Sequence, residues 1–253
     1  MNFFFGINND KFKSQIQIPI FKNREFKLSK IRLFKCFIQN KLWNIREIVK
    51  KKNNEYFYEL KDEEISNNEI YFLAEDKTIK NFNSKSLENY NNFTDTDPAF
   101  RSNLKIYIKD KGFSSYQSEY PFSMIEKKGS ILSPINSLAN IDAEKNYIFL
   151  KNIYTLPIEE TFFGFLINYS TKKIEEKFKL KTNYSNCIEI NKKLIKPEIF
   201  FTTNNFLGIP IYVSVKNSHI SCEHTHPLQE YILSKNKYEK ITNLKKEINE
   251  IIA

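Results

Sequence analysis

The three histidines of this 253-residue chain all lie in one short stretch, HISCEHTHPLQEY, residues 219–231. The preceding residues IPIYVSVKNS have the alternation of a strand followed by a turn, so we expect the histidines on the second strand of a hairpin. Residues two apart on a strand share a face, which groups Ile220, Cys222, His224 and His226 and leaves His219 on the other face. Because Ile220 and Cys222 are apolar, their face is predicted to be the inner one.

Glu230 follows His226 by four residues and completes the spacing His-x-His-x-x-x-Glu. Histidine and carboxylate side chains bind zinc and iron, and three protein ligands leave positions open for water or substrate. The spacing resembles the histidine and carboxylate part of the first cupin motif, in which two histidines on a strand and a nearby glutamate hold a divalent metal. The resemblance covers residues 224–230; the chain lacks the expected glycines and any downstream histidine for the second motif. It implies a zinc or iron site with His224, His226 and Glu230 as ligands.

The same stretch also has a purely structural interpretation. Histidines at a strand end often hydrogen-bond the backbone of a neighbouring loop, and Glu230 would then be a solvated residue ahead of a helix. Cys222 has no helix N-terminus or cationic neighbour in the sequence that would lower its thiol pKa, which favours a core residue over a nucleophile. The sequence leaves both interpretations open.

A second stretch with binding chemistry is GFSSYQSEYPFSM, residues 112–124, where aromatic residues alternate with polar ones. Sugar rings stack an apolar face on aromatic side chains and offer hydroxyls at their rims, so this stretch suits carbohydrate binding. Arg101 lies shortly before it and suits a carboxylate or phosphate, or a pairing with nearby aspartates. The alternative is an aromatic loop that packs over the end of a sandwich. The candidate ligand-binding residues are Arg101, Tyr116, Gln117, Glu119 and Tyr120.

The elements that must position these residues are mostly strands. Aromatic and β-branched runs with a period of two, such as QIQIPIF and LKIYIKD, recur along the chain between turn-forming residues. Polar turns in LKIYIKDKGFSSY, SMIEKKGSIL and FGFLINYSTKKIEEKFKL predict consecutive hairpins and therefore antiparallel sheets. After Ser234, apolar residues recur every three or four positions, which predicts a helix over 235–252. The predicted fold class is all-β, an antiparallel β-sandwich of jelly-roll type, with a C-terminal α-helix.

A polar, asparagine-rich stretch between Asp76 and Phe100 separates two strand-rich regions. A chain of this length buries a core as one large domain or as two small ones. We place a soft boundary in the polar stretch, which gives an N-terminal β-rich unit over 1–96 and a β-sandwich with the helix over 97–253.

Composition limits the classes of function. Lys and Arg number 39 against 30 Asp and Glu, a net charge of +9, but the lysines are spread along the chain. No basic recognition helix or RNP-like aromatic pattern accompanies them, which argues against nucleic-acid binding. No glycine-rich loop precedes a helix, which argues against dinucleotide and P-loop sites. Without a signal-peptide pattern, a long apolar run or a disulfide framework, we expect a soluble, cytoplasmic protein with no membrane span.

Two hypotheses for the function follow. The first is a β-sandwich binding or assembly protein that recognises a carbohydrate or a protein partner through the region around Tyr116 and Tyr120. The second is a cupin-like metal-dependent enzyme that acts on a small polar or sugar substrate through His224, His226 and Glu230. The sequence contains no complete catalytic set, so it leaves open whether the protein is an enzyme.

Overall fold

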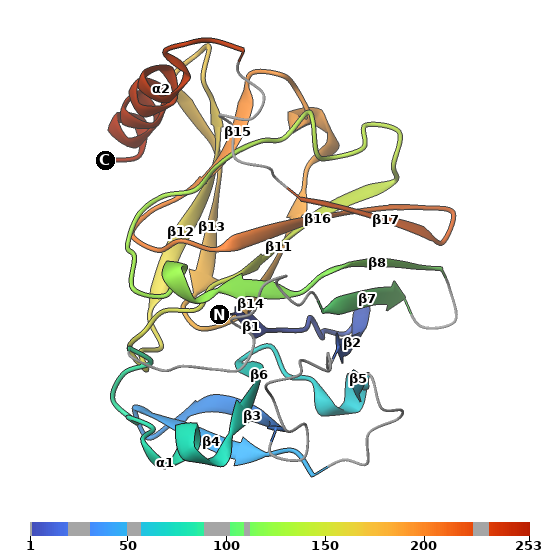
Figure 1. Cartoon of the computed structure of the whole chain (residues 1–253). Coiled ribbons are helices and arrows are strands. Elements are labelled where there is room, and N and C mark those ends of the chain that lie inside the picture. The colour runs from blue at the N-terminus through green and yellow to red at the C-terminus, as the bar shows by residue number, and fades with distance from the viewer. Residues whose placement is uncertain (1, 20–30, 50–56, 89–101, 109–111, 225–232) are drawn as a thin grey trace. The chain divides into compact units, whose positions relative to one another are not determined.

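Antiparallel strands are the main secondary structure of the described residues. The computed structural model describes residues 2–19, 31–49, 57–88, 102–108, 112–224 and 233–253. Of these residues, 50% lie in strands and 14% in helices, and the strands form four sheets (Figure 1). The predicted all-β fold with a C-terminal helix is confirmed.

The chain forms two compact units, each with two sheets. Residues 102–127, which the sequence analysis assigned to the C-terminal domain, belong to unit 1 because their strands pair with strands near the N-terminus. Two later segments also return to unit 1. Unit 1 comprises Met1–Lys127, Ile153–Glu159 and Asn183–Ser185, and unit 2 comprises Lys128–Asn152, Glu160–Thr182 and Asn186–Ala253.

Unit 1 contains a five-stranded and a four-stranded antiparallel sheet. The five-stranded sheet has the order β4 (Leu42–Glu47), β3 (Ile31–Gln39), β6 (Glu69–Glu75), β1 (Asn2–Phe4) and β9 (Glu119–Pro121). The four-stranded sheet has the order β5 (Phe57–Leu60), β2 (Phe12–Pro19), β7 (Asn103–Ile108) and β8 (Phe113–Gln117). Short helices of this unit are η2 (Asp62–Glu64), α1 (Asp76–Lys80) and η3 (Phe122–Met124). The predicted hairpin in LKIYIKDKGFSSY is confirmed as β7 and β8.

The period-two pattern of β2 determines which face of the four-stranded sheet enters the core. Phe12, Ile16 and Ile18 are fully buried, and Ile16 lies opposite the buried Leu104 of β7. Burying one such side chain contributes about 1.5–3 kcal/mol, and a slip of one residue would turn all of them outward. The register is therefore strongly specified, and the odd-numbered residues of β2, β7 and β8 lie on the outer face of the sheet.

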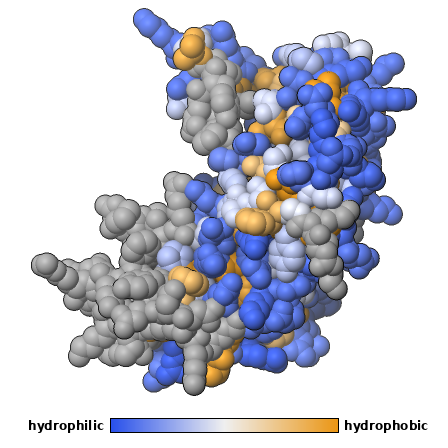
Figure 2. Space-filling view, turned by 90° about the vertical axis from the view of Figure 1, so that its right-hand side faces the viewer, coloured by the Kyte–Doolittle hydropathy of each residue, from blue (hydrophilic) through white to orange (hydrophobic). Residues whose placement is uncertain are grey.

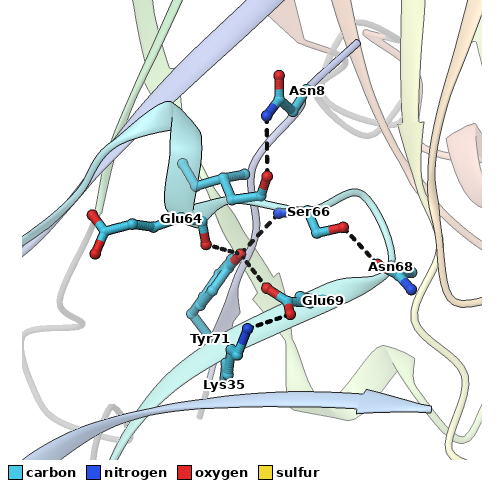
Figure 3. A network of polar contacts seen from close by, with 8 residues as sticks. Asn8, Lys35, Glu64, Ser66, Asn68, Glu69 and Tyr71 are labelled. Carbon is cyan, nitrogen blue, oxygen red and sulfur yellow. Dashed lines mark hydrogen bonds and ion pairs between the residues drawn. The ribbon is translucent and has the colours of Figure 1, made fainter. Parts of the chain in front are cut away.

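A polar network ties the loop between β5 and β6 to the five-stranded sheet (Figure 3). The Tyr71 hydroxyl accepts a hydrogen bond from the Ser66 backbone N–H at 3.1 Å. The same hydroxyl lies 2.9 Å from a carboxylate oxygen of Glu69 and 3.1 Å from the carbonyl oxygen of Glu64. Glu69 also pairs with Lys35 at 2.6 Å. Burial, reinforced by the negative charge of Glu69, raises the pKa of Tyr71, so its hydroxyl remains a donor to the carboxylate.

Unit 2 contains two four-stranded antiparallel sheets. The first has the order β10 (Leu132–Pro134), β15 (Ile199–Thr203), β12 (Thr161–Asn168) and β13 (Lys173–Lys181). The second has the order β14 (Ser185–Ile190), β11 (Lys145–Lys151), β16 (Ile209–Lys216) and β17 (His219–His224), and η4 (Lys192–Leu194) lies between β14 and β15. The hairpin predicted in FGFLINYSTKKIEEKFKL is confirmed as β12 and β13. The hairpin predicted in SMIEKKGSIL is wrong, because β10 pairs with β15 instead of with the segment before it.

The helix α2 (Lys237–Ile252) closes one face of the sheet that contains β12. Its apolar positions recur every three or four residues, and the buried Ile248 packs with Phe165 and Ile167 of β12. Leu244 and Ile251 of the same helix face extend this contact. The predicted helix over 235–252 is thus confirmed, and packing against the sheet explains its stability.

Among the residues that Figure 2 colours by hydropathy, most are hydrophilic, and the apolar ones form small, separated patches. Single exposed apolar residues are normal on protein surfaces, whereas large patches would indicate an apolar interface. In the described part of the chain, every helix is too short or too polar to span a bilayer.

Candidate functional site

The histidine stretch begins with the predicted hairpin of β16 and β17, which is confirmed. Asn217 and Ser218 have φ values of 47° and 70°, the left-handed backbone that a two-residue hairpin turn of type I′ requires. Ile220 is buried and His224 is half-buried, whereas His219 is exposed. The predicted alternation of inner and outer residues is therefore confirmed for residues 219–224.

The metal site implied by the cupin resemblance remains a prediction. His224 lies at the end of β17, but His226 and Glu230 lie outside the residues that the structure describes. Within the described residues, no three His, Cys, Asp or Glu side chains are grouped closely enough to hold a metal ion. His219 Nδ1 lies 3.1 Å from the carbonyl oxygen of Asn217, a local turn contact of the kind that the structural interpretation expects.

The candidate ligand-binding residues lie in different environments. Tyr116 is half-buried opposite Leu104 on the inner face of its sheet, and Tyr120 of β9 is fully buried, which raises the pKa of its hydroxyl. Glu119 accepts a hydrogen bond from the backbone N–H of Ser102 at 2.5 Å. Gln117 lies on the outer face of the sheet, and Arg101 lies outside the described residues. The four described residues of this set therefore lie in different environments, and their joint binding role remains a prediction.

Gln117 instead belongs to a set of polar and aromatic residues that the register aligns on the outer face of the four-stranded sheet of unit 1. Phe113 of β8 lies opposite Tyr107 of β7, and two residues further along, Ser115 lies opposite Lys105. Gln117 lies opposite Asn103. On the other side of β7, a residue of β2 lies opposite each of these β7 residues: Lys13 opposite Tyr107, Gln15 opposite Lys105 and Gln17 opposite Asn103. We call these residues the amide–aromatic face: Lys13, Gln15, Gln17, Asn103, Lys105, Tyr107, Phe113, Ser115 and Gln117.

Phe113 and Lys105 form the most prominent contact of the amide–aromatic face. Phe113 is 60% exposed although it belongs to a regular strand. The Lys105 ammonium lies 4.3 Å from the centroid of the Phe113 ring and 5.9 Å from the centroid of the Tyr107 ring. Cation–π attraction at such distances contributes about 0.5–1 kcal/mol at an exposed site. The lysine thus positions a positive charge beside two aromatic rings.

Tyr107 is fixed from its other end by the loop after β5. Partial burial, the charge of Asp62 and a hydrogen bond to that carboxylate raise the pKa of Tyr107. Asp62 is itself held in place, because Asn8 Nδ2 donates to its carbonyl oxygen at 2.9 Å and to that of Ile65 at 3.1 Å. The polar network of Figure 3 anchors the same loop. The aromatic end of the face is therefore supported by rigid neighbours.

The opposite end of the face consists of side-chain amides. Gln17, Asn103 and Gln117 lie side by side on three neighbouring strands. Within the described part of the chain, these three side chains form no hydrogen bond with protein groups. An amide offers two donors and an acceptor, so this row can bind several hydroxyl groups of one ligand. The arrangement of stacking surface, cation and side-chain amides supports binding of a polar ligand.

The aromatic stretch that contains Phe113 is apparent in the sequence, whereas its partners Lys105, Tyr107 and the glutamines of β2 are not. A usable signal was present, because LKIYIKD places Lys105 and Tyr107 on the face opposite Leu104. The role of β2 could not be found in this way, since nothing local pairs it with β7. Comparisons of the chain with family models, with characterised proteins and with solved structures find no match.

Proposed function

We propose that this chain is a carbohydrate-binding protein and that the amide–aromatic face of unit 1 is its binding site. The observation that carries the proposal is Phe113, an aromatic residue that is 60% exposed beside the ring of Tyr107. Fully burying a phenylalanine contributes about 1.5–3 kcal/mol to stability, and a position that is 60% exposed forgoes a large part of it. The exposed ring gains some of that contribution when a sugar ring stacks on it.

The spacing of the polar groups supports an extended glycan. Neighbouring strands lie about 4.8 Å apart, and residues two apart on a strand lie about 6.6 Å apart. Amides at these intervals meet the hydroxyl groups of successive sugar units of a chain that lies flat on the sheet. Phe113 and Gln117 belong to the same strand, four residues apart, so one glycan chain can contact both.

The charge of the face favours acidic glycans over neutral ones. Lys13 and Lys105 are the cations of the face, and Lys105 lies beside the stacking ring. A uronic acid unit that stacks on Phe113 brings its carboxylate close to the Lys105 ammonium. An ion pair at such an exposed position contributes about 0.2–1 kcal/mol and weakens as salt is added.

Titration calorimetry with Phe113→Ala tests the proposal, using an alginate hexasaccharide as the acidic probe and maltohexaose as the neutral probe. The matched control is Tyr238→Ala, because Tyr238 is another exposed aromatic residue, 64% exposed, on α2. We expect the alginate probe to bind the wild type better than maltohexaose does. Phe113→Ala should weaken this binding by about tenfold, which is 1.4 kcal/mol, and Tyr238→Ala should not change it.

Two results would count against the proposal. If neither hexasaccharide binds the wild type, or if Phe113→Ala and Tyr238→Ala bind equally well, the amide–aromatic face is not a glycan site. A protein partner, the other ligand class predicted for this fold, would then be sought at the same face by cross-linking from a cysteine introduced at Ser115.

A further inference from the structure

Unit 2 contains a cleft that the proposed function does not use. Its volume is about 570 Å³, within the range of about 300–1,000 Å³ that is usual for small-molecule sites. The C-terminal end of α2 forms one wall, and the segments around Ser130 and Asn204 form the others. Most of the lining is polar, and Lys128 is the only charged side chain among the described residues that line it.

Hydrogen bonds hold the β15 side of the cleft in place. Asn204 Oδ1 accepts a hydrogen bond from the Phe163 backbone N–H at 2.7 Å, and the carbonyl oxygen of Asn205 accepts one from Gly129 at 3.1 Å. Thr203 donates its hydroxyl to the carbonyl oxygen of Phe206 at 2.9 Å. Binding a ligand against a wall that is already fixed avoids the entropic cost of ordering it.

Three polar side chains of the cleft have hydrogen-bonding capacity left over. Ser130 is only 8% exposed, yet its hydroxyl has no protein partner within the described residues. The side-chain amides of Asn205 and Asn249 likewise form no hydrogen bond to the described part of the protein. Among the described residues, the buried side-chain atoms without a partner belong to Asn8 and Tyr120, so the Ser130 hydroxyl reaches solvent, as the exposed Asn205 and Asn249 do. All three are therefore accessible to a ligand.

The charges around the cleft favour a neutral ligand. Lys128 supplies one positive charge, and its ammonium already lies 5.5 Å from the centroid of the Phe206 ring. The last turn of α2, which includes Asn249 and Ile252, presents carbonyl oxygens at the negative end of the helix dipole. Anions would be attracted by the lysine and repelled by the helix end. Hydroxyl groups both donate and accept hydrogen bonds, so they suit the lysine as well as the carbonyl oxygens of the helix end.

We propose that this cleft binds one neutral monosaccharide, with Ser130, Asn205 and Asn249 as its hydrogen-bonding residues. This site lies in unit 2 and does not depend on the amide–aromatic face of unit 1. The hydroxyl of Ser130 and the two amides bond to ring hydroxyls, and the carbonyl end of α2 accepts from others. A single sugar unit fits within a cleft of this volume and occupies part of it, whereas an extended glycan suits the open sheet of unit 1.

The test is nuclear magnetic resonance of the full chain labelled with nitrogen-15. Glucose, galactose, mannose and N-acetylglucosamine are titrated one at a time, with inorganic phosphate and acetate as anionic probes. We expect at least one sugar to shift the side-chain amide signals of Asn205 and Asn249, and neither anion to do so. The Phe113→Ala variant should respond in the same way, which separates this site from the proposed glycan face.

Variants complete the test. Ser130→Ala and Asn249→Leu should each weaken sugar binding by about tenfold. Asn243→Leu is the matched control, because Asn243 is an exposed asparagine of α2 that does not line the cleft, and binding should be unchanged. If no sugar shifts these signals, if phosphate or acetate shifts them instead, or if all three variants bind as the wild type does, the cleft is not a sugar site. The wild-type titration needs no variant to fold, so it decides the question alone.

Discussion

Lys105 and Phe113, on the neighbouring strands β7 and β8, place an ammonium group 4.3 Å from the centre of an aromatic ring. This pair combines the two properties that an acidic glycan needs, a stacking surface and a positive charge. The ring is 60% exposed, so the contact with lysine leaves most of the phenylalanine accessible.

Replacing Lys105 with Gln should lower affinity for an alginate hexasaccharide about threefold to tenfold and leave affinity for maltohexaose unchanged. The reason is that the amide keeps hydrogen-bonding capacity but removes the charge that attracts a carboxylate. Lys177→Gln is the matched control, because the Lys177 ammonium lies 4.0 Å from the centroid of Phe163 in unit 2. Titration calorimetry at low and high salt measures the affinities of both variants for the two oligosaccharides. Equal losses for the two variants would mean that the effect comes from net charge and not from this pair.

Tyr71→Phe should change how stability depends on pH. The folded-state pKa of Tyr71 is raised by burial, so the protonated hydroxyl contributes stability that is fully present below about pH 10 and is lost as the pH rises above it. The variant should lose about 1–3 kcal/mol at neutral pH, because Ser66 loses its acceptor. Above pH 10 the free energy of unfolding of the variant should fall less steeply than that of the wild type, by about 1.4 kcal/mol per pH unit. Urea unfolding at several pH values, with Tyr238→Phe as the control, would disprove this if all three proteins gave parallel profiles.

Ile248→Ala should destabilise unit 2 by about 2–4 kcal/mol, since it opens a cavity between α2 and the Phe165 and Ile167 side chains. Ile174 of β13 is 42% exposed, so Ile174→Ala should lower the free energy of unfolding by no more than about 0.5 kcal/mol. Chemical denaturation gives both values. Similar losses for the two variants would show that α2 contributes little to the stability of the sheet on which it packs.

The metal hypothesis predicts that the wild type binds one zinc or iron ion and that His224→Ala and His226→Ala abolish binding. His219 is exposed on the opposite face of β17, so His219→Ala should bind normally. Binding should weaken as the pH falls below about 6.5, because protonated imidazole cannot coordinate a metal. Metal content after loading and dialysis measures this. If the wild type holds no metal, or if all three variants hold as much metal as the wild type, the structural interpretation of the stretch is the correct one.

Much of the fold could be predicted because its signals are local. The alternation in QIQIPIF and LKIYIKD and the polar turns identified strands and hairpins, and the apolar period after Ser234 identified α2. Long-range pairing left no such signal: β1 joins β6 and β9, and β2 lies between β5 and β7. Residues 153–159 and 183–185 return to unit 1, which no local pattern indicates.

The candidate site was only partly predictable for the same reason. The aromatic stretch that contains Phe113 was identified, but Tyr120 in it is a core residue, since β9 pairs with β1 in the five-stranded sheet. The partners of Phe113 come from β7 and β2, and the pairing of β2 depends on contacts across about ninety residues of chain. Composition cannot distinguish an outward aromatic residue from a buried one.

The most direct test of the glycan proposal is to map where an acidic oligosaccharide binds on the wild-type chain. Nuclear magnetic resonance titration with an alginate hexasaccharide should shift the ring protons of Phe113 and Tyr107 and the side-chain amides of Gln17, Asn103 and Gln117 together, with one affinity. Shifts confined to other parts of the chain, or no shift at any concentration of the hexasaccharide, would contradict it.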